Sequence, residues 1–483
     1  MRAFSIQLVF RVLGMAASFF TVALTTKTLG REAYGDLTTA VVFIGMWMSL
    51  TELGVGATIV RRAASGTGDL ARLIRINCGL SIVYAVPLFV LAAVSGLLVY
   101  RDSSELRAML LIVSGSLLLT SLSTCFEPVF LATVRFKAVA ISDFASRLGS
   151  LAATAVLVAV HGELVWFAAV QLVPPAVQLV IQGVAASRIL SVRPVFAMRE
   201  AWDLLRESLP QTGVLIVAVL YWRVDGVVLS LRSTTDQVGV YGLAVSLAFT
   251  TSVVASFFLS STLSSMTDLY ARDSVAFGRF IKGSIETMLF VGAPIAVVGA
   301  ALAHPMISLV GSAEFAHDGG RVLAFLFVAV AITFLNGALS QALFAAHEQV
   351  FLLRLNIVNL VANIVLNIFL TSALGALGAA LALFVSELSG LVLVSIRLAR
   401  RSSYRTPWMF AARLAVPVAA SLGVVIALSH LSVVILGPIA AVVYLAVNAL
   451  IGPITWSRIR AMRAQEEIES AINDESNPGR IHS

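Results

Sequence analysis

The chain consists of long apolar runs separated by short stretches that hold most of the charged residues. The runs are continuously apolar and do not alternate, which excludes a transmembrane β-barrel and favours helices. A helix crosses the membrane core in about 20 residues, and about 14 windows of this kind occur. They lie near residues 4–25, 38–60, 76–100, 108–131, 143–160, 164–186, 209–231, 238–266, 284–311, 323–346, 351–371, 376–399, 409–430 and 433–455. The pattern predicts an all-α, polytopic membrane protein.

Composition supports this prediction. Of the 483 residues, 59% are apolar and 12% are charged, with a mean hydropathy of +0.95. Soluble domains contain about 45–50% apolar and about 25% charged residues. There are too few charged residues to cover the surface of a soluble protein. We therefore expect most of the surface to face lipid and not water. Cys78 and Cys125 lie within apolar runs and are expected to pack there. We expect no metal site and no cofactor.

The positions of arginine and lysine predict the orientation. Alternate loops hold most of these cations, at residues 61–75, 135–147, 188–206, 272–282, 397–405 and 458–463. The opposite loops hold only Lys27, Arg31, Arg101, Arg107, Arg232 and Arg321. Because cytoplasmic loops are enriched in arginine and lysine, both termini are predicted to be cytoplasmic. The net charge of +7 then reflects topology and gives no reason to expect a nucleic-acid partner. The predicted location is the cell inner (plasma) membrane.

Two sequence landmarks repeat at nearly constant spacing. LGREAYG at 29–35 resembles DQVGVYG at 236–242, and the turn at 132–137 resembles that at 345–350, with offsets of about 207 and about 213 residues. Six predicted helices separate the copies, so both halves cross the membrane in the same direction. Parallel repeats of this kind are a transporter architecture with the substrate between two lobes. The predicted parts are an N-lobe (1–186), a cytoplasmic linker that serves as a hinge (187–208), a C-lobe (209–400), two further helices (401–457) and a cytoplasmic tail (458–483).

The same segments carry a resemblance to a known family. LGREAYGD at 29–36, LGVG at 53–56 and VRR at 60–62 resemble the N-terminal signature of the polysaccharide-biosynthesis oligosaccharide flippases. This family belongs to the multidrug/oligosaccharidyl-lipid/polysaccharide exporter superfamily. Similarity to the second-lobe and late-helix signatures is found in DGVVL at 225–229, VGVYGLA at 238–244 and GALGAA at 375–380, the last followed by Ser386-Glu387. The resemblance covers about residues 4–400.

The resemblance implies two parallel six-helix repeats around a central cavity, with two C-terminal helices added. It also implies that a polyprenyl-diphosphate-linked oligosaccharide is moved by alternating access for the biosynthesis of O-antigen, exopolysaccharide or capsule. The implied partners are this lipid-linked substrate and membrane lipids. A polymerase and glycosyltransferases of the same pathway are further candidate partners.

Charged residues within the predicted helices are costly in lipid and therefore mark candidate sites. Arg11 and Arg223, in the opening helices of the two lobes, are predicted to bind the diphosphate, since a guanidinium offers two parallel hydrogen bonds to phosphate oxygens. Alternatively, Arg11 reaches the headgroups and Arg223 pairs with another helix. Asp225 points to a different side of the helix from Arg223. Together with Glu52 and Glu387, it is a candidate for ion coupling or for an ion pair, and each could instead be structural.

Amide side chains form two stripes. At 100° per residue, four asparagines fall within about 80° of arc, and three glutamines share a face with Pro174 and Pro175, which should bend their helix. Such amides would hydrogen-bond sugar hydroxyls or, as we favour for the asparagines, other helices. The stripes are Asn356, Asn359, Asn363 and Asn367, and Gln171, Gln178 and Gln182; the candidates for substrate binding among them are Asn356, Asn359, Asn363 and Gln178.

Catalytic motifs are missing from the sequence. It has no P-loop, no HExxH and no Cys/His cluster, and its loops are too short for a glycosyltransferase site, so we do not expect an enzyme. Three alternatives remain open. One is a drug–cation antiporter of the same superfamily, which would need carboxylates for its cargo, and another is a flippase for the peptidoglycan precursor. The third is a membrane scaffold that recruits glycosyltransferases through basic loops and the tail after Trp456.

Overall fold

The computed structural model describes residues 2–135, 137–402 and 404–454, and every regular element in these ranges is helical. Twelve helices are long and apolar enough to cross a membrane, or 13 spans when the bent pair Thr235–Thr250 and Ser252–Arg272 counts as one. The predicted all-α, polytopic fold is therefore confirmed. The predicted cytoplasmic tail lies outside the described residues.

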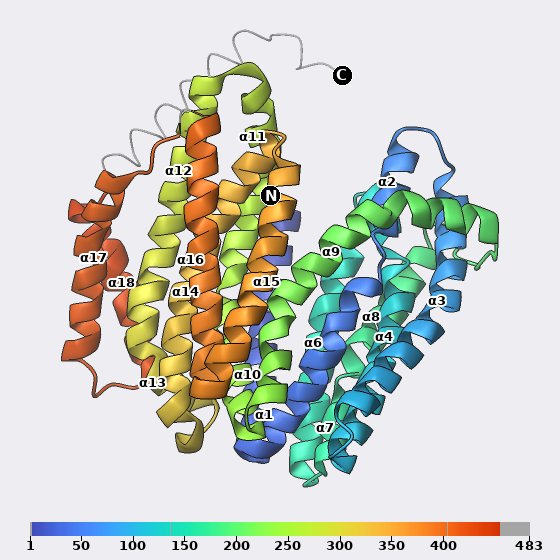
Figure 1. Ribbon diagram of the computed structural model, residues 1–483, viewed down its shortest axis with the longest axis horizontal. Coiled ribbons are helices and arrows are strands. Elements are labelled where there is room, and N and C mark those ends of the chain that lie inside the picture. Colours follow the sequence, from blue (N-terminus) through green and yellow to red (C-terminus); the bar gives the residue numbers. More distant parts are fainter. Residues whose placement is uncertain (1, 136, 403, 455–483) are drawn as a thin grey trace. The chain divides into compact units, whose positions relative to one another are not determined.

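Two compact units make up the chain. The first comprises Met1–Thr250, Ile307–Leu326 and Glu348–Gly390, and the second comprises Thr251–Met306, Phe327–His347 and Leu391–Ser483. Figure 1 shows the helices in chain order. The helices that lie wholly in the first unit are α1 (Arg2–Trp47), η1 (Met48–Leu50), α2 (Val55–Ala64), α3 (Leu70–Val99), α4 (Ser104–Thr124), α5 (Glu127–Ala132), α6 (Lys137–Ala159), α7 (Leu164–Val170), α8 (Val173–Ser187), α9 (Met198–Arg232), α10 (Thr235–Thr250) and α15 (Gln349–Leu374).

The remaining helices belong to the second unit or are shared. Shared between the units are α13 (Ala300–Val310), α14 (Ala313–Ala345) and α16 (Ala376–Arg401). The second unit alone holds α11 (Ser252–Arg272), α12 (Ser274–Pro294), the π-helix η2 (Ile295–Gly299), α17 (Trp408–Ala427) and α18 (Val433–Ile451). Within that unit the Ser421 hydroxyl donates to the Ala440 carbonyl at 2.8 Å, which joins α17 to α18. The Tyr444 hydroxyl donates to the Phe290 carbonyl at 2.7 Å, which joins α18 to α12.

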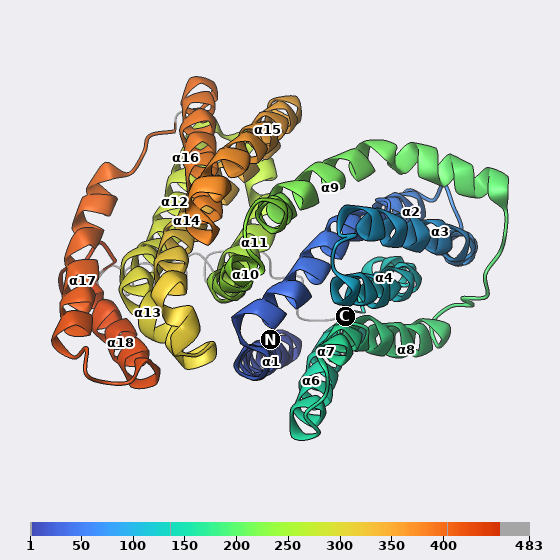
Figure 2. The ribbon, with the colours of Figure 1, turned by 60° about the horizontal axis from the view of Figure 1, so that its bottom comes forward.

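Helix α1 consists of two arms joined at Gly30. This residue has φ 73° and ψ −176°, a left-handed backbone conformation that glycine adopts without a steric penalty. The candidate span Leu13–Ala64 has 52 residues, more than twice the length of one crossing. The predicted helices 4–25 and 38–60 therefore correspond to two crossings that meet at the Gly30 kink and are counted together as one candidate span, so the structure gives fewer spans than the sequence predicts. Figure 2 shows the change of direction between the arms.

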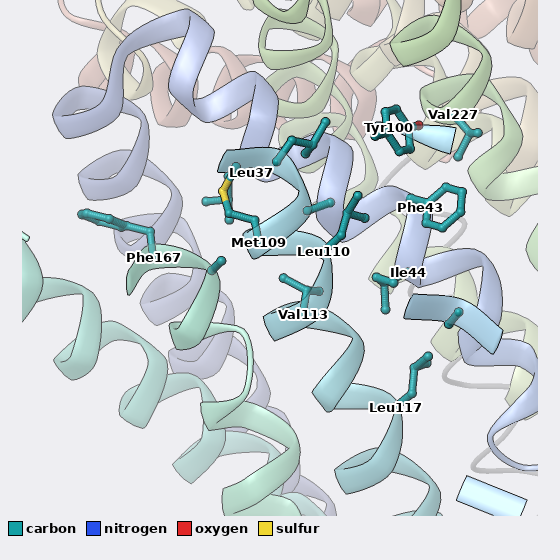
Figure 3. Packing of buried hydrophobic residues seen from close by; sticks show 14 of the residues in the cluster. Leu37, Phe43, Ile44, Tyr100, Met109, Leu110, Val113, Leu117, Phe167 and Val227 are labelled. Carbon is teal, nitrogen blue, oxygen red and sulfur yellow. The ribbon is translucent and has the colours of Figure 1, made fainter. Parts of the chain in front are cut away.

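An apolar core fixes the second arm of α1 to α4. Figure 3 shows Leu37, Phe43 and Ile44 of α1 beside Met109 and Leu110 of α4, all of them buried. At the end of α3, Tyr100 packs edge-on against Phe43 with ring centroids 5.5 Å apart. Helices in lipid associate through close packing, so this core holds the second arm of α1 in place against α3 and α4.

The repeated turn has the same backbone in both halves. Val134 has φ 55° and His347 has φ 59°, and these residues are 213 positions apart. Each lies two residues beyond the end of a helix, α5 or α14. Positive φ is uncommon for residues other than glycine. Its recurrence at the offset of the sequence repeat supports the internal duplication.

The predicted linker, 187–208, is fastened to α2 and α3. The backbone amide of Val195 donates to the Arg75 carbonyl at 2.9 Å, and Arg72 pairs with Glu200 at 2.6 Å. Glu207 pairs with both Arg61 and Arg62. Helix α9 begins inside the linker and continues without interruption for 35 residues. The second half of the linker is therefore the beginning of a long helix, and that beginning is anchored to α2 and α3.

Candidate functional site

A cavity of about 240 Å³ lies in the first unit, between the two arms of α1, α9 and α10. Its wall includes residues of both the predicted N-lobe and the predicted C-lobe. Hydroxyl groups and aromatic rings alternate around it, together with one amide, one cation and one carboxylate. The polar and aromatic lining residues are Thr21, Thr25, Tyr34, Thr38, Gln171, Trp222, Arg223, Asp225, Tyr241, Ser246 and Phe249.

Arg223 provides the cation of this cavity. Its guanidinium lies against Gly45 in the second arm of α1, where a Cβ would come within 3.3 Å of both Nε and Cζ. The missing side chain at Gly45 thus makes room for Arg223. Within the described part of the chain, no hydrogen bond or ion pair engages the Arg223 side chain. Its donors are therefore available to an anion that enters the cavity.

Asp225 lies on another side of α9 and does not neutralise Arg223. Its carboxylate is only 4% exposed and accepts a hydrogen bond from the Tyr241 hydroxyl at 3.0 Å. Residues two positions apart point to different sides of a helix, and Asp225 has Tyr241 as its partner. The bond joins α9 to α10 at the cavity wall, where both residues contribute to the lining.

A second polar cluster joins α9, α15 and α16. Buried Glu387 accepts a hydrogen bond from the Tyr221 hydroxyl at 2.8 Å. On α15, Asn367 donates to the Asn363 side-chain oxygen at 3.0 Å, and both residues are fully buried. Asn359 is also buried. In this state these asparagines lie within the packed helices, and none of them lines the cavity.

The other predicted site residues lie elsewhere in the first unit. Arg11 is exposed on the first arm of α1, and Asn356 is exposed on α15. Glu52 is half-buried in the turn before α2, and Gln178 is half-buried on α8. None of these four lines the cavity. The glutamine stripe is divided, since Gln171 reaches the cavity while Gln182 donates to the Ser142 hydroxyl at 3.0 Å.

The bend predicted at the two prolines of this stripe is a break in the helix. Helix α7 ends at Val170 and α8 begins at Val173, with Pro174 in its first turn. Proline is favoured there because it has no amide hydrogen to leave unpaired. Gln171, which lines the cavity, lies directly at this break.

Arg147 is an intramembrane cation that the sequence analysis placed in a loop. It lies in the middle of α6, pairs with Asp143 at 3.2 Å and donates to the Ser18 hydroxyl of α1 at 2.8 Å. The predicted helix began six residues too late, at 143. Because Asp143 and Arg147 are four residues apart, their opposite charges were a signal that the helix starts earlier.

Arg31 lies one turn before the cavity lining, at the Gly30 end of the second arm of α1. Its guanidinium lies 2.9 Å from Asp236 of α10 and 2.9 Å from Asp318 of α14. It also donates to the Glu314 carbonyl at 3.1 Å. Tyr34, one turn along α1, is already part of the cavity lining. The opposite charges of Arg31 and Asp236 within the two repeated motifs were the available sequence signal for this contact.

The fold is similar to that of solved transporters of the multidrug/oligosaccharidyl-lipid/polysaccharide (MOP) exporter superfamily. A structure of the lipid II flippase MurJ in an inward closed conformation is 16% identical with a TM-score of 0.77, over 93% of this chain and 98% of that chain. An inward-facing multidrug resistance MATE family transporter of the MOP superfamily is 14% identical with a TM-score of 0.63, over 80% and 95%. An outward-facing MATE family transporter is 15% identical with a TM-score of 0.51, over 81% and 96%. These similarities concern the fold.

Sequence comparison gives the family. The model of the family described as "Polysaccharide biosynthesis protein" matches residues 1–264, more than half of the chain. The chain belongs to this family, as the motifs at 29–62 predict. No curated protein sequence matches the chain. It is a multi-pass membrane protein with a transporter fold, and its family handles lipid-linked substrates.

Proposed function

We propose that this protein is a flippase that moves a polyprenyl-diphosphate-linked oligosaccharide from the inner to the outer leaflet of the cell inner membrane. The product would serve the biosynthesis of a cell-surface polysaccharide. The observation that carries the proposal is the unengaged guanidinium of Arg223 inside a cavity within a membrane-spanning helix bundle. A cation without a counter-ion among membrane-spanning helices is costly, so its retention is best explained by an anionic substrate.

The rest of the lining suits the same substrate. Threonine and serine hydroxyls donate to and accept from sugar hydroxyls, while Trp222 and Tyr34 offer flat apolar faces. The cavity of about 240 Å³ is smaller than typical ligand pockets of about 300–1,000 Å³. The present volume would hold the diphosphate and little more. Transport of the complete headgroup would therefore require α1 to separate from α9 or α10, with the prenyl chain remaining in lipid.

The proposed cycle has the Arg31 cluster as its outer closure. If both termini are cytoplasmic, as the loop arginines predict, the Gly30 end of α1 faces away from the cytoplasm. The headgroup would then enter from the cytoplasmic side, and release would break the ion pairs from Arg31 to Asp236 and Asp318. Arg11, Asn356 and Gln178 would contact substrate in another state of the cycle. Asn359 and Asn363 could do so only if α15 moved away from its present neighbours.

Asp225 and Glu387 are the proposed coupling residues. Each carboxylate is buried and accepts a hydrogen bond from a tyrosine hydroxyl. Exchange of an ion at either carboxylate would change the contacts of α9 with α10 or α16. Glu52, half-buried before α2, is a third candidate.

The test is a deletion strain analysed by mass spectrometry of its lipid-linked sugars. The proposal predicts a viable strain that loses one cell-surface polymer and accumulates the corresponding lipid-linked oligosaccharide. Loss of viability with accumulation of the peptidoglycan precursor would favour the flippase for that precursor. Increased sensitivity to cationic drugs with normal polymer would favour the antiporter, although Arg223 in the cavity would repel such a cargo.

A further inference from the structure

Helix α9 is longer than one membrane crossing requires. At 1.5 Å per residue its 35 residues extend over about 52 Å, whereas the apolar core is about 30 Å thick. Figures 1 and 2 show the first part of α9 beside α2 and α3. It is held there by the Arg72–Glu200 and Arg62–Glu207 ion pairs. The segment therefore lies over one end of the first unit.

The side chains in the first part of α9 lie on separate faces of the helix. At 100° per residue, Met198, Trp202 and Leu209 fall within about 40° of arc. Their exposed fractions are 67%, 60% and 53%. Ala201 and Leu204 on another face are buried against α2 and α3. The helix is thus apolar both toward the protein and away from it.

Charges occupy the positions between these two apolar faces. Glu200 and Glu207 lie next to the buried apolar face and pair with arginines of α2 and α3. Arg199 and Arg206 lie next to the exposed apolar face, and both are exposed. Neither arginine forms an ion pair with any residue that the structure describes. The two glutamates are therefore neutralised by the protein, and the two arginines are left at the edge of an apolar surface.

We infer that residues 196–209 bind the anionic phospholipid surface of the adjacent leaflet. Phe196, Met198, Trp202 and Leu209 enter the region between headgroups and acyl chains, and Arg199 and Arg206 bind lipid phosphates. An apolar face that includes tryptophan and is bordered by arginine is typical of helices that lie in the membrane interface. Negative headgroups are the complementary charge for the two free guanidinium groups. This inference does not depend on the identity of the transported substrate.

The anchoring has a consequence for the cavity. Helix α9 continues without interruption from this surface to Arg223. The lipid surface thus holds the beginning of the helix that carries the cavity cation. Since Gly213 has open space around the position of its missing side chain, α9 has room to bend between the two.

Spin labels on adjacent positions test the depth of the segment. Trp202→Cys and Asp203→Cys are made in full-length protein in which Cys78 and Cys125 are replaced by alanine, and the protein is placed in vesicles of equal parts phosphatidylcholine and phosphatidylglycerol. Both positions are exposed, and they lie about 100° apart on the helix. The label at 202 should be reached by oxygen and shielded from a water-soluble nickel reagent, with the opposite result at 203. Equal access of the nickel reagent to both positions would overturn the inference.

The lipid charge is tested with a double variant. Arg199→Gln/Arg206→Gln should weaken burial of the label at 202 in the mixed vesicles, by about fivefold per arginine in the equilibrium between buried and water-exposed label. Arg101→Gln/Arg107→Gln, which removes two exposed arginines elsewhere, is the matched control and should change nothing. Vesicles of phosphatidylcholine alone should abolish the difference between the two double variants. If the label responds equally to both pairs of substitutions, anionic lipid is not the ligand of this surface.

Discussion

Gly35 of α1 and Gly239 of α10 pack directly against each other. A Cβ at Gly35 would lie 1.9 Å from the Thr235 carbonyl oxygen, and one at Gly239 would lie 2.3 Å from the Arg31 carbonyl oxygen. Each glycine therefore faces the residue four positions before the other glycine. The two repeated motifs of the sequence are thus each other's contact partners. Small residues at such a crossing let two backbones approach closely in a membrane.

This contact positions the closure of the cavity. It brings the start of the second arm of α1 onto the start of α10, where Arg31 meets Asp236. The cavity lining begins one turn further along both helices, at Tyr34 and Val238. The duplication therefore supplies both the crossing and the charged contact that ends the cavity.

Gly35→Ala should disrupt the crossing. The added methyl group would meet backbone atoms, which cannot move aside as the end of a flexible side chain can. We expect a loss of at least about 1–3 kcal/mol of stability, as for overpacked cores, measured as a lower thermal midpoint in detergent. Gly423→Ala in α17 is the control, because nothing lies within 4 Å of its missing side chain. Equal midpoints for the two variants would contradict the close contact.

Crosslinking position 31 to position 318 should stop transport. Arg31→Cys/Asp318→Cys, in protein lacking Cys78 and Cys125, would be joined by a short thiol crosslinker while the Gly30 end is closed. We expect polymer export to fall when the crosslinker is added and to return when a cleavable linker is reduced. Arg31→Cys alone serves as the control and should be insensitive to the reagent. Full export by the crosslinked protein would show that this end need not open.

Glu387→Gln separates coupling from packing. The amide can still accept the Tyr221 hydroxyl, so the contact between α9 and α16 should survive. If Glu387 couples transport to an ion, export should fall at least tenfold while the thermal midpoint stays near that of the unaltered protein. Tyr221→Phe is the matched variant, because it removes the hydrogen bond and keeps the carboxylate. A Glu387→Gln protein that is unstable but transports normally per folded molecule would assign the residue a structural role.

Asp273 should stabilise the start of α12 in a pH-dependent manner. Hydrogen bonds from the backbone amides of Ala276 and Val275 to its side chain hold the pKa of this carboxyl below its ordinary value. The stabilisation is therefore complete above the unfolded pKa and is lost as pH falls through the folded pKa. Asp273→Ala should lower the thermal midpoint at neutral pH, and the difference should shrink in acid. A difference that does not vary with pH would mean that the ionised cap contributes nothing.

The apolar runs and the repeated motifs were sufficient to predict the helical class, the repeated crossing of the membrane and the family. These features depend on the membrane and on local sequence, which a single chain displays directly. The kink at Gly30 was not predicted, because a glycine in a loop and a glycine joining two helices give the same sequence signal. A bend at Pro174 was predicted, since proline acts on its own helix, and the structure has a break there.

The candidate site was harder to predict because it depends on which helices are neighbours. Arg223 was identified from its position in an apolar run, and the structure adds that Gly45 makes room for it. Asn363 has the same sequence signal as a cavity residue, yet it is fully buried beside Asn367. Arg31 was treated only as a loop cation, because the proximity of Asp236 and Asp318 follows from tertiary contacts more than 200 residues apart.

The most direct test of the account is polymer export by Arg223→Ala, measured together with the amount of protein in the membrane. Arg232→Ala, an exposed arginine at the end of the same helix, is the control. The account predicts that Arg223→Ala is present at a normal level and exports no polymer, that Arg223→Lys exports some, and that Arg232→Ala exports normally. Normal export by Arg223→Ala would contradict the claim that this guanidinium binds the diphosphate.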